Sequence, residues 1–324
     1  MSVDVSVIIC CYNSEQRLPK TLEYLSNQNV RGVNWEVVLV DNNSKDNTTK
    51  VAYSEWNKLG AVVSLLVVKE NIPGLSFARK KGIESSRGNI LVFCDDDNWL
   101  DSNYINHIHS LFKNKSYRII GGWGLPISDI PFPNWFSQLE GYGYAVGKQG
   151  RRTGKGYAVH GAGMAIKRID GLSLLDKRFI PLLSDRKGKK LSTGGDAEIS
   201  ILIGGENRFF DEALIYYHYL PENRLTWEYF IKLNYYVGVA DSYLYFYKIG
   251  KDDPILALKK YLYRIFSSVK ILICSVKRNY FNDPTFQDKI DLIYYKGYLI
   301  QITLNLFTFK KHLEQAKRNL VVFS

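Results

Sequence analysis

The first hundred residues alternate short apolar runs with segments in which apolar side chains recur at helical spacing. The four runs are VSVIICC, WEVVLVD, VVSLLVV and NILVFC. Runs rich in β-branched residues are typical of strands buried on both faces of a parallel sheet. Because each run is followed by a helical segment, the pattern predicts an α/β fold with a doubly wound, mostly parallel sheet.

The composition agrees with a chain that builds a buried core. Hydrophobic residues make up 46% of the 324 residues and charged residues 23%. These fractions are ordinary for a cored protein and exclude a disordered, collagen-like or coiled-coil chain.

Polar side chains follow each predicted strand at the point where the apolar run ends. They are Asn13, Asp41, Asn71 and the acidic run 95–97. Ligands of open parallel sheets bind outside the carboxyl ends of the strands. We therefore expect the chemistry of this chain to lie along one edge of the sheet.

Beyond Asp101 the alternation gives way to glycine, proline and aromatic residues. We expect one further strand over 159–168 and, over 192–203, a loop that caps a helix. From about Pro221 the pattern indicates helices. The predicted divisions are a first domain over 1–220, with halves at 1–100 and 101–220, and a mainly helical C-terminal extension over 221–324.

A glycine-rich basic loop lies between Gly147 and Tyr157. Its cations are Lys148, Arg151, Arg152 and Lys155. Glycines permit a loop to close and cations permit contact with an anion, so one interpretation is a lid that excludes water from a site. A solvated basic loop without function is the other.

The formal net charge of +11 belongs mainly to the C-terminal quarter, because residues 251–324 hold 13 Lys or Arg and 6 Asp or Glu. These cations are interspersed with aromatic and aliphatic residues, which is typical of an amphipathic helix lying on anionic lipid. The alternatives are a helical part that packs on the first domain and a homodimer interface. No nucleic-acid partner is expected, since the segment contains no nucleic-acid motif.

Cysteine spacing and the two ends of the sequence bear on where in the cell we expect the protein. The cysteines are Cys10, Cys11, Cys94 and Cys274, without a CxxC pair or a disulfide-framework spacing. We see no secretory leader at the N-terminus, and lysines and arginines interrupt the apolar stretches of the tail. We expect a cytoplasmic protein, with attachment at the inner face of the cell membrane as an open alternative.

The acidic run Asp95, Asp96 and Asp97 is the sharpest chemical feature. Three acids directly after a buried strand repel one another unless a cation or ligand hydroxyls offset the charge. An oxygen-ligated Mn²⁺ or Mg²⁺ would do so. The alternative is that one acid caps the next helix while the others are solvated.

Six ordered segments now give the chain a family resemblance. They are VSVIICCYN with Pro19, VVLVDNNSKDNT, NIPGLSFARKKGI, FCDDDNWLD, GAGMAIKR and GGDAEISILI. Together they resemble a family 2 glycosyltransferase of the GT-A fold, over residues 3 to about 220. The resemblance implies an enzyme that uses a sugar nucleotide and a divalent metal, Mn²⁺ or Mg²⁺, and transfers the sugar with inversion. It makes 1–100 the nucleotide-binding half and 101–220 the acceptor-side half.

The resemblance also implies roles for single residues in a nucleotide-sugar site. Cys11, Tyr12 and Asn13 correspond to positions that meet the nucleobase and ribose, and Asp41 to an acid that binds the base, most simply uracil. Arg79 corresponds to an arginine near the diphosphate, although Lys80 replaces the asparagine usual after it. The acidic run supplies the D-x-D pair, in which Asp95 meets ribose and Asp97 holds the metal, while Asp96 is assigned to the same nucleotide-sugar site.

On the acceptor side, Asp196 resembles the aspartate that acts as the catalytic base, with Gly195 in place of the usual glutamate. The resemblance further assigns Glu198, Trp123 and Gly163 to the acceptor side. It assigns His218 to the metal, and the alternative for His218 is a structural histidine held by hydrogen bonds. The expected partners are a nucleoside-diphosphate sugar and a glycan or polyprenyl-linked acceptor.

Two rival functions remain open on the sequence. A sugar-phosphate nucleotidyltransferase shares a related fold, but its Gly-rich basic segment does not follow 5–11. A catalytically silent sugar-nucleotide or glycan-binding module fits the altered Gly195-Asp196 pair.

Overall fold

The alternation of strands and helices predicted for the first hundred residues is present in the structure. The structure, a computed structural model, describes residues 2–61, 63–114, 116–139, 144–150, 152–155, 159–183, 193–205, 207–281 and 284–324. The first elements are β1 (Val5–Cys11), α1 (Leu18–Ser26), β2 (Trp35–Asp41), α2 (Thr48–Lys58), β3 (Leu65–Lys69), α3 (Leu75–Ser85) and β4 (Ile90–Asp95). The four strands lie in the order β3, β2, β1, β4, and all are parallel.

The second half of the sheet is mixed rather than parallel. Its elements are β5 (Asn98–Leu100), α4 (Tyr104–Leu111), β6 (Ile119–Ile127), β7 (Gly147–Lys148), β8 (Gly154–Lys155), β9 (Ala165–Lys167), α5 (Arg168–Leu172), α6 (Gly195–Gly204) and β10 (Arg208–Tyr219). From β4 the sheet continues as β9, β6, β10 and β5, and β9 runs antiparallel to both β4 and β6.

The strand expected over 159–168 is shorter than predicted. Only β9 is ladder-paired, and the chain before it makes a turn in which Gly163 has a φ of +69°. A side chain on Gly163 would also lie 2.8 Å from the Tyr104 hydroxyl. The left-handed conformation requires glycine at this turn and prevents the strand from starting earlier.

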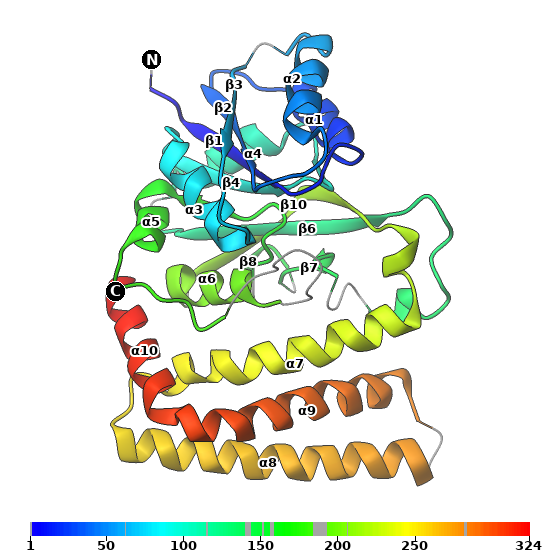
Figure 1. Ribbon diagram of the computed structural model, residues 1–324, viewed down its shortest axis with the longest axis vertical. Helices are drawn as coiled ribbons and strands as arrows, with labels where there is room; N and C mark the ends of the chain where they lie inside the picture. Colours follow the sequence, from blue (N-terminus) through cyan, green and yellow to red (C-terminus); the bar gives the residue numbers. More distant parts are fainter. Residues whose placement is uncertain are drawn as a thin grey trace.

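The C-terminal extension is helical, as predicted. It contains α7 (Trp227–Ile249), α8 (Pro254–Phe281), α9 (Phe286–Leu304) and α10 (Phe309–Val322). Figure 1 shows α7 running beneath the sheet, with α9 below α7 and α8 in the lowest, outermost layer. Thr226 caps α7, and Thr285 with Asp288 forms a capping box that starts α9. None of the described helices combines the length and the apolarity needed to cross a bilayer.

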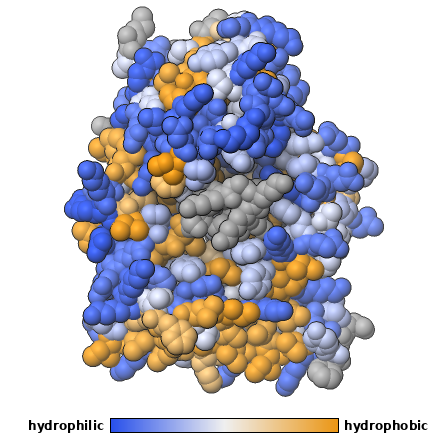
Figure 2. Space-filling model, in the orientation of Figure 1, coloured by the Kyte–Doolittle hydropathy of each residue, from blue (hydrophilic) through white to orange (hydrophobic). Residues whose placement is uncertain are grey.

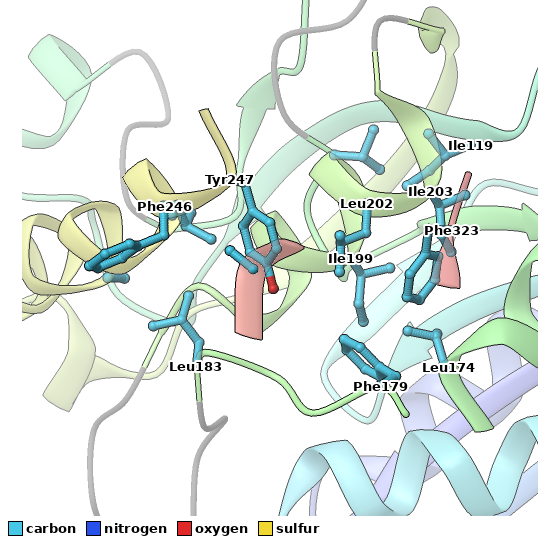
Figure 3. Packing of buried hydrophobic residues seen from close by; sticks show 14 of the residues in the cluster. Ile119, Leu174, Phe179, Leu183, Ile199, Leu202, Ile203, Phe246, Tyr247 and Phe323 are labelled. Atoms are coloured by element: carbon cyan, nitrogen blue, oxygen red, sulfur yellow. The ribbon is translucent and has the colours of Figure 1, made fainter. Parts of the chain in front are cut away.

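One hydrophobic cluster joins the extension to the sheet. It includes Ile203 of α6, Phe246 and Tyr247 of α7 and Phe323 after α10. Figure 3 shows Ile203, Tyr247 and Phe323 around Ile199 and Leu202, with Phe246 farther out beyond Tyr247. Burial of this apolar surface is the main free-energy contribution holding the layers together. The division of the chain at residue 220 stays a prediction, and the cluster contains side chains from both sides of it.

Candidate functional site

A cavity of about 790 Å³ opens at the carboxyl ends of the parallel strands, where polar strand ends predicted a site. It lies between the sheet edge and the start of α7, since Tyr229 and Leu233 form part of its wall. The predicted site residues that line it are Cys11, Tyr12, Asn13, Arg79, Asp95, Asp96, Asp97, Asp196 and His218. Side chains separated by more than a hundred residues in the sequence therefore share one cavity.

The loops after β1 and β2 are tied together at one end of the cavity. Asn13, with a φ of +50°, donates its backbone N–H to Ser44 Oγ at 3.0 Å and accepts from the Lys45 N–H at 2.8 Å. These bonds fix the backbone on which Tyr12 is presented, 42% exposed, to the cavity. An exposed aromatic ring beside fixed polar groups suits a nucleobase and ribose.

Asp41 does not itself line the cavity, and its predicted contact with a base stays a prediction. Its carboxylate accepts from the Ser44 N–H at 2.9 Å and from Thr49 Oγ1 at 2.7 Å. Burial opposes ionisation, but these hydrogen bonds hold the pKa of Asp41 below its ordinary value. Asp41 shapes the loop, and Asn42 and Asn43 after it are the residues that face the cavity.

Asn42 links the second strand end to the third. Its amide nitrogen donates to the Ile72 carbonyl at 2.7 Å, and its Oδ1 accepts from the Gly74 N–H at 2.7 Å. Gly74 has a φ of +139° and precedes α3, the helix that carries Arg79. Asn42 therefore positions the start of the helix whose arginine enters the cavity.

The three acids of the run 95–97 have different surroundings. Burial and the neighbouring Asp97 raise the pKa of Asp95 to about 7, while Arg79 opposes the rise. Burial also raises the pKa of Asp96, but its carboxylate is paired with Arg17 NH2 at 2.6 Å and accepts from the Ser14 hydroxyl. The ionised form of Asp95 is therefore disfavoured unless a ligand or cation stabilises it, whereas Asp96 already has its partners.

Asp97 and His218 are brought together by strand pairing. His218 of β10 lies opposite Asn98 of β5, so its ring is next to Asp97, with Nε2 3.7 Å from Oδ1. Burial lowers the pKa of His218, which favours the neutral imidazole, and its Nδ1 has no hydrogen-bond partner among the described residues. Arg224 NH1 lies 3.4 Å from the other oxygen of Asp97.

Asp97 and His218 supply part of the coordination shell that the expected divalent metal needs. Within the described ranges no group of three or more His, Cys, Asp or Glu side chains is arranged to hold a metal ion. A carboxylate beside a neutral imidazole fits two coordination positions of Mn²⁺, and substrate phosphates and water commonly fill the others. The residues present fit a metal shared with a diphosphate, not a metal held by protein alone.

Asp196 faces the same cavity from the first turn of α6. Its Oδ2 accepts from the Gly161 N–H at 2.9 Å and its Oδ1 from the Ala197 N–H at 2.9 Å. A Cβ placed on Gly161 would lie 2.4 Å from Arg79 NH2 and 3.5 Å from the Cβ of Asp196. The bare backbone of Gly161 therefore lets the arginine and the carboxylate approach the same point.

Glu198, expected on the acceptor side, is buried and lies outside the cavity lining. Glu198 is 1% exposed and accepts from the backbone N–H groups of Leu182 and Leu183 and from the Tyr247 hydroxyl. It does not line the cavity. A buried carboxylate with these donors ties three segments together and has no open side for a sugar.

Trp123 and Gly163 also lie outside the cavity lining. The Trp123 ring packs under Lys148 Nζ, 4.5 Å from the ring centroid, and the Gly163 carbonyl accepts from Tyr104. Lys148 belongs to β7 and pairs with Glu212 at 3.1 Å, so it is held at the sheet edge. Of the loop expected as a lid, Arg151 and 156–157 lie outside the described residues.

Several cavity residues were missed by the sequence analysis. They are Arg17, Asn42, Asn43, Lys45, Arg224, Tyr229 and Leu233. Arg17 and Lys45 follow the first two strands closely, a signal that could have been used. Arg224 and the α7 side chains depend on how the extension packs, which the sequence pattern does not specify.

The fold and the cavity define the class of the protein as GT-A. In this class, the strand ends that face the nucleotide share a site with an acidic residue that lies far away in the sequence. Residues 6–170, about half of the chain, match the family described as Glycosyl transferase family 2. The chain belongs to this family, as the six segments predicted.

Curated relatives match over part of the chain. The poly(ribitol-phosphate) β-N-acetylglucosaminyltransferase TarP of Staphylococcus aureus is 27% identical over 122 residues, 37% of this chain and 37% of its own. The human dolichyl-phosphate β-glucosyltransferase is 35% identical over 99 residues, 29% of this chain and 31% of its own. The chain thus spans less than half the length of the curated relatives that it matches.

Solved structures share the fold at low identity. S. aureus TarS 1–349 in complex with UDP has a TM-score of 0.52 at 13% identity, covering 98% of this chain and 90% of that one. The mannosyltransferase PcManGT of Pyrobaculum calidifontis, in complex with GDP-Man and Mn²⁺, has a TM-score of 0.55 at 15% identity, covering 99% and 88%. These likenesses extend the predicted fold class to nearly the whole chain.

Proposed function

We propose that this protein is an inverting glycosyltransferase that moves a sugar from a nucleoside-diphosphate sugar, most simply UDP-linked, to a hydroxyl of a glycan or lipid-linked glycan. One observation carries the proposal: Asp196 lines the same 790 Å³ cavity as Asp95 and Asp97, about a hundred residues away in the chain. A donor held at the strand ends would place its sugar before a carboxylate that belongs to another element.

The nucleotide half of the cavity would bind and orient the donor. Tyr12 and Asn13 suit the nucleoside, Asp95 suits ribose hydroxyls, and the Arg79 guanidinium suits the diphosphate, since its fork of N–H groups matches phosphate oxygens. The GDP-Man and UDP complexes of fold relatives support a nucleotide-sugar donor in this class. Asp97 and His218 would hold Mn²⁺ or Mg²⁺. When bound, the metal neutralises charge on the diphosphate leaving group.

The transfer itself needs one proton movement. The acceptor oxygen bonds to the anomeric carbon as the bond from that carbon to the phosphate oxygen breaks, and the electron pair of the broken bond stays on the diphosphate. The hydroxyl proton goes to the Asp196 carboxylate, which the Gly161 N–H orients. A single displacement from the face opposite the leaving group inverts the anomeric centre.

The test is the isosteric variant Asp196→Asn with a labelled donor. Asn retains an oxygen that accepts from Gly161 but does not take the proton, so transfer should fall by a factor of about 10² to 10⁴ while donor affinity stays within roughly twofold. Asp176→Asn is the matched control, because Asp176 pairs with Arg178 and does not line the cavity. Retained transfer, or loss of donor affinity in parallel with activity, would contradict the role of Asp196.

Donor and metal are identified by binding. Sugar nucleotides that bind the native state raise its melting temperature, and the stabilisation should increase with Mn²⁺. Asp97→Ala should remove the increase caused by Mn²⁺. Nucleotide binding without turnover of any donor would instead support a silent binding module.

A further inference from the structure

The outer face of α8 carries a row of apolar side chains that no part of the described chain covers. Figure 2 shows hydrophobic residues gathered over the lowest layer, where α8 and α9 lie. The α8 apolar row consists of Ile255, Leu262, Phe266, Ile273 and Tyr280, which are 70%, 46%, 57%, 50% and 74% exposed. Their intervals of four or seven positions place them along one side of the helix.

The opposite side of α8 is firmly packed, so the row is not the result of a loosely attached helix. Ala257 and Tyr261 are fully buried in the main hydrophobic cluster. The Tyr261 hydroxyl donates to the Ile302 carbonyl of α9 at 2.7 Å. With its inner face bound to α9, the helix presents the row outward as a fixed surface.

Exposed apolar side chains also occur on the neighbouring helix α9 and just after it. Ile302 belongs to the end of α9 that lies beside the start of α8, and the same end carries Leu304, 53% exposed. Phe307, just after α9, is 89% exposed. Exposed apolar side chains gathered on packed helices mark a docking site more strongly than single scattered ones do.

Cations accompany the row, and acids do not. The α8 sequence contains six Lys or Arg and no Asp or Glu. Lys259, Lys270 and Lys277 are exposed beside the row, and among the described residues no ion pair involves them. Lys270 Nζ lies 4.5 Å from the centre of the Phe266 ring, so the charge sits directly against the apolar row.

We propose that α8 docks this protein on a membrane surface that contains anionic lipid, with the helix lying in the plane of the interface and the α8 apolar row inserted at the headgroup level. Apolar side chains flanked by lysines match such an interface in both hydrophobicity and charge. The helix does not meet the criteria for crossing a bilayer, which agrees with a position on the surface.

Charge decides between a lipid surface and a second copy of the chain. Two copies joined through the row would bring two α8 helices with only positive side chains against each other, and no acid of α8 could offset the repulsion. An anionic headgroup layer is complementary to the same lysines. This inference is independent of the proposed transfer reaction, because docking is measured without any sugar.

The test is flotation of the full chain with vesicles of phosphatidylcholine alone and of phosphatidylcholine mixed with phosphatidylglycerol. We expect binding to the mixed vesicles and weaker binding at high salt. Replacing Lys259, Lys270 and Lys277 by Ala should lower binding roughly a hundredfold, about fivefold for each lysine. Phe266→Ser with Ile273→Ser should lower it at least tenfold.

Ile169→Ser is the matched control, because Ile169 is an equally exposed apolar residue, 71%, on α5. Its binding should equal that of the parent protein, and melting temperatures should show that all variants fold. Equal flotation with both vesicle types, or flotation that the α8 variants leave unchanged, would overturn the proposal. So would a dimer in analytical ultracentrifugation that Phe266→Ser with Ile273→Ser dissociates, since the row would then be an interface between copies.

Discussion

The Tyr247 hydroxyl of α7 donates a hydrogen bond to Glu198 of α6 at 2.5 Å, and Asn319 of α10 donates to the same hydroxyl at 2.8 Å. Figure 3 shows Tyr247 within the hydrophobic cluster that joins these layers. Glu198 lies two positions after Asp196, in the first turn of α6. The C-terminal helices therefore bind the helix that carries the candidate base through one buried polar chain.

Tyr247→Phe should lower the free energy of unfolding by about 2 kcal/mol, because the buried Glu198 carboxylate loses a donor and Asn319 loses an acceptor. Tyr263→Phe is the control, since Tyr263 is 72% exposed and should change stability by less than about 0.5 kcal/mol. Urea denaturation measures both variants. Equal stability of Tyr247→Phe and the parent would show that the polar chain does not hold the layers.

Glu36→Gln tests how much a buried carboxylate, at the end of the sheet away from the cavity, contributes to stability. Glu36, 1% exposed, accepts from the Ser6 hydroxyl at 2.7 Å and from the Arg87 guanidinium at 2.6 and 2.8 Å. The amide accepts fewer of these bonds, so we expect a loss of about 3 kcal/mol at neutral pH. Glu55→Gln, at a surface pair with Lys58, should change little.

The loss at Glu36 should depend on pH in a defined direction. Burial opposes its ionisation, but the Arg87 and Ser6 hydrogen bonds lower its pKa below the ordinary value of 4.5. Since the unfolded state binds the proton more tightly, the contribution of the carboxylate is complete above about pH 4.5 and disappears as the pH falls through the folded-state pKa. The stability difference between parent and Glu36→Gln should therefore shrink in acid, and a difference that grows there would contradict the assignment.

The sheet and the strand-end residues could be predicted because they depend on local pattern and on parallel pairing. A β-branched run fixes β1 and β4, and their register places Cys10 opposite Asp95, so polar groups after both strands meet. The proximity of Asp196 needed the family resemblance, since no local rule places α6 at this edge. Arg224 was missed because its contact with Asp97 depends on the packing of the extension.

The buried position of Glu198 has a simpler physical origin. Successive residues of an α-helix turn by about 100°, so Asp196 and Glu198 point roughly 200° apart. Once Asp196 was assigned to the cavity, its neighbour two positions later had to face the interior, where α7 and the segment at Leu182 supply its donors. Helical geometry alone could therefore have predicted that Glu198 and Asp196 face opposite sides of α6.

Single Asn variants of the acidic run 95–97 should show which acid stabilises the fold and which acid binds the ligand. Asp96→Asn breaks the charge pair with Arg17 and should lower unfolding free energy by about 2 kcal/mol. Asp95→Asn should leave the fold intact and weaken nucleotide-sugar affinity about tenfold, because it removes an acceptor for ribose hydroxyls. Denaturation and nucleotide titration of both variants check this, and an Asp96→Asn protein of normal stability that loses only affinity would reverse the two roles.

Gly161→Ala tests whether the arginine and the candidate base depend on a bare backbone between them. The added methyl group would lie 2.4 Å from Arg79 NH2, the far end of a flexible side chain, so the guanidinium should move while the fold remains. We expect donor affinity to fall about tenfold, by loss of one charge-assisted phosphate contact, with a small change in melting temperature.

Gly171→Ala is the complementary control, because its methyl group would press on Leu91 and Ile166 inside the core, 3.0 and 3.1 Å away. It should lower the melting temperature and leave donor affinity unchanged. If Gly161→Ala binds the donor normally, Arg79 does not contact the diphosphate from the position that Gly161 allows.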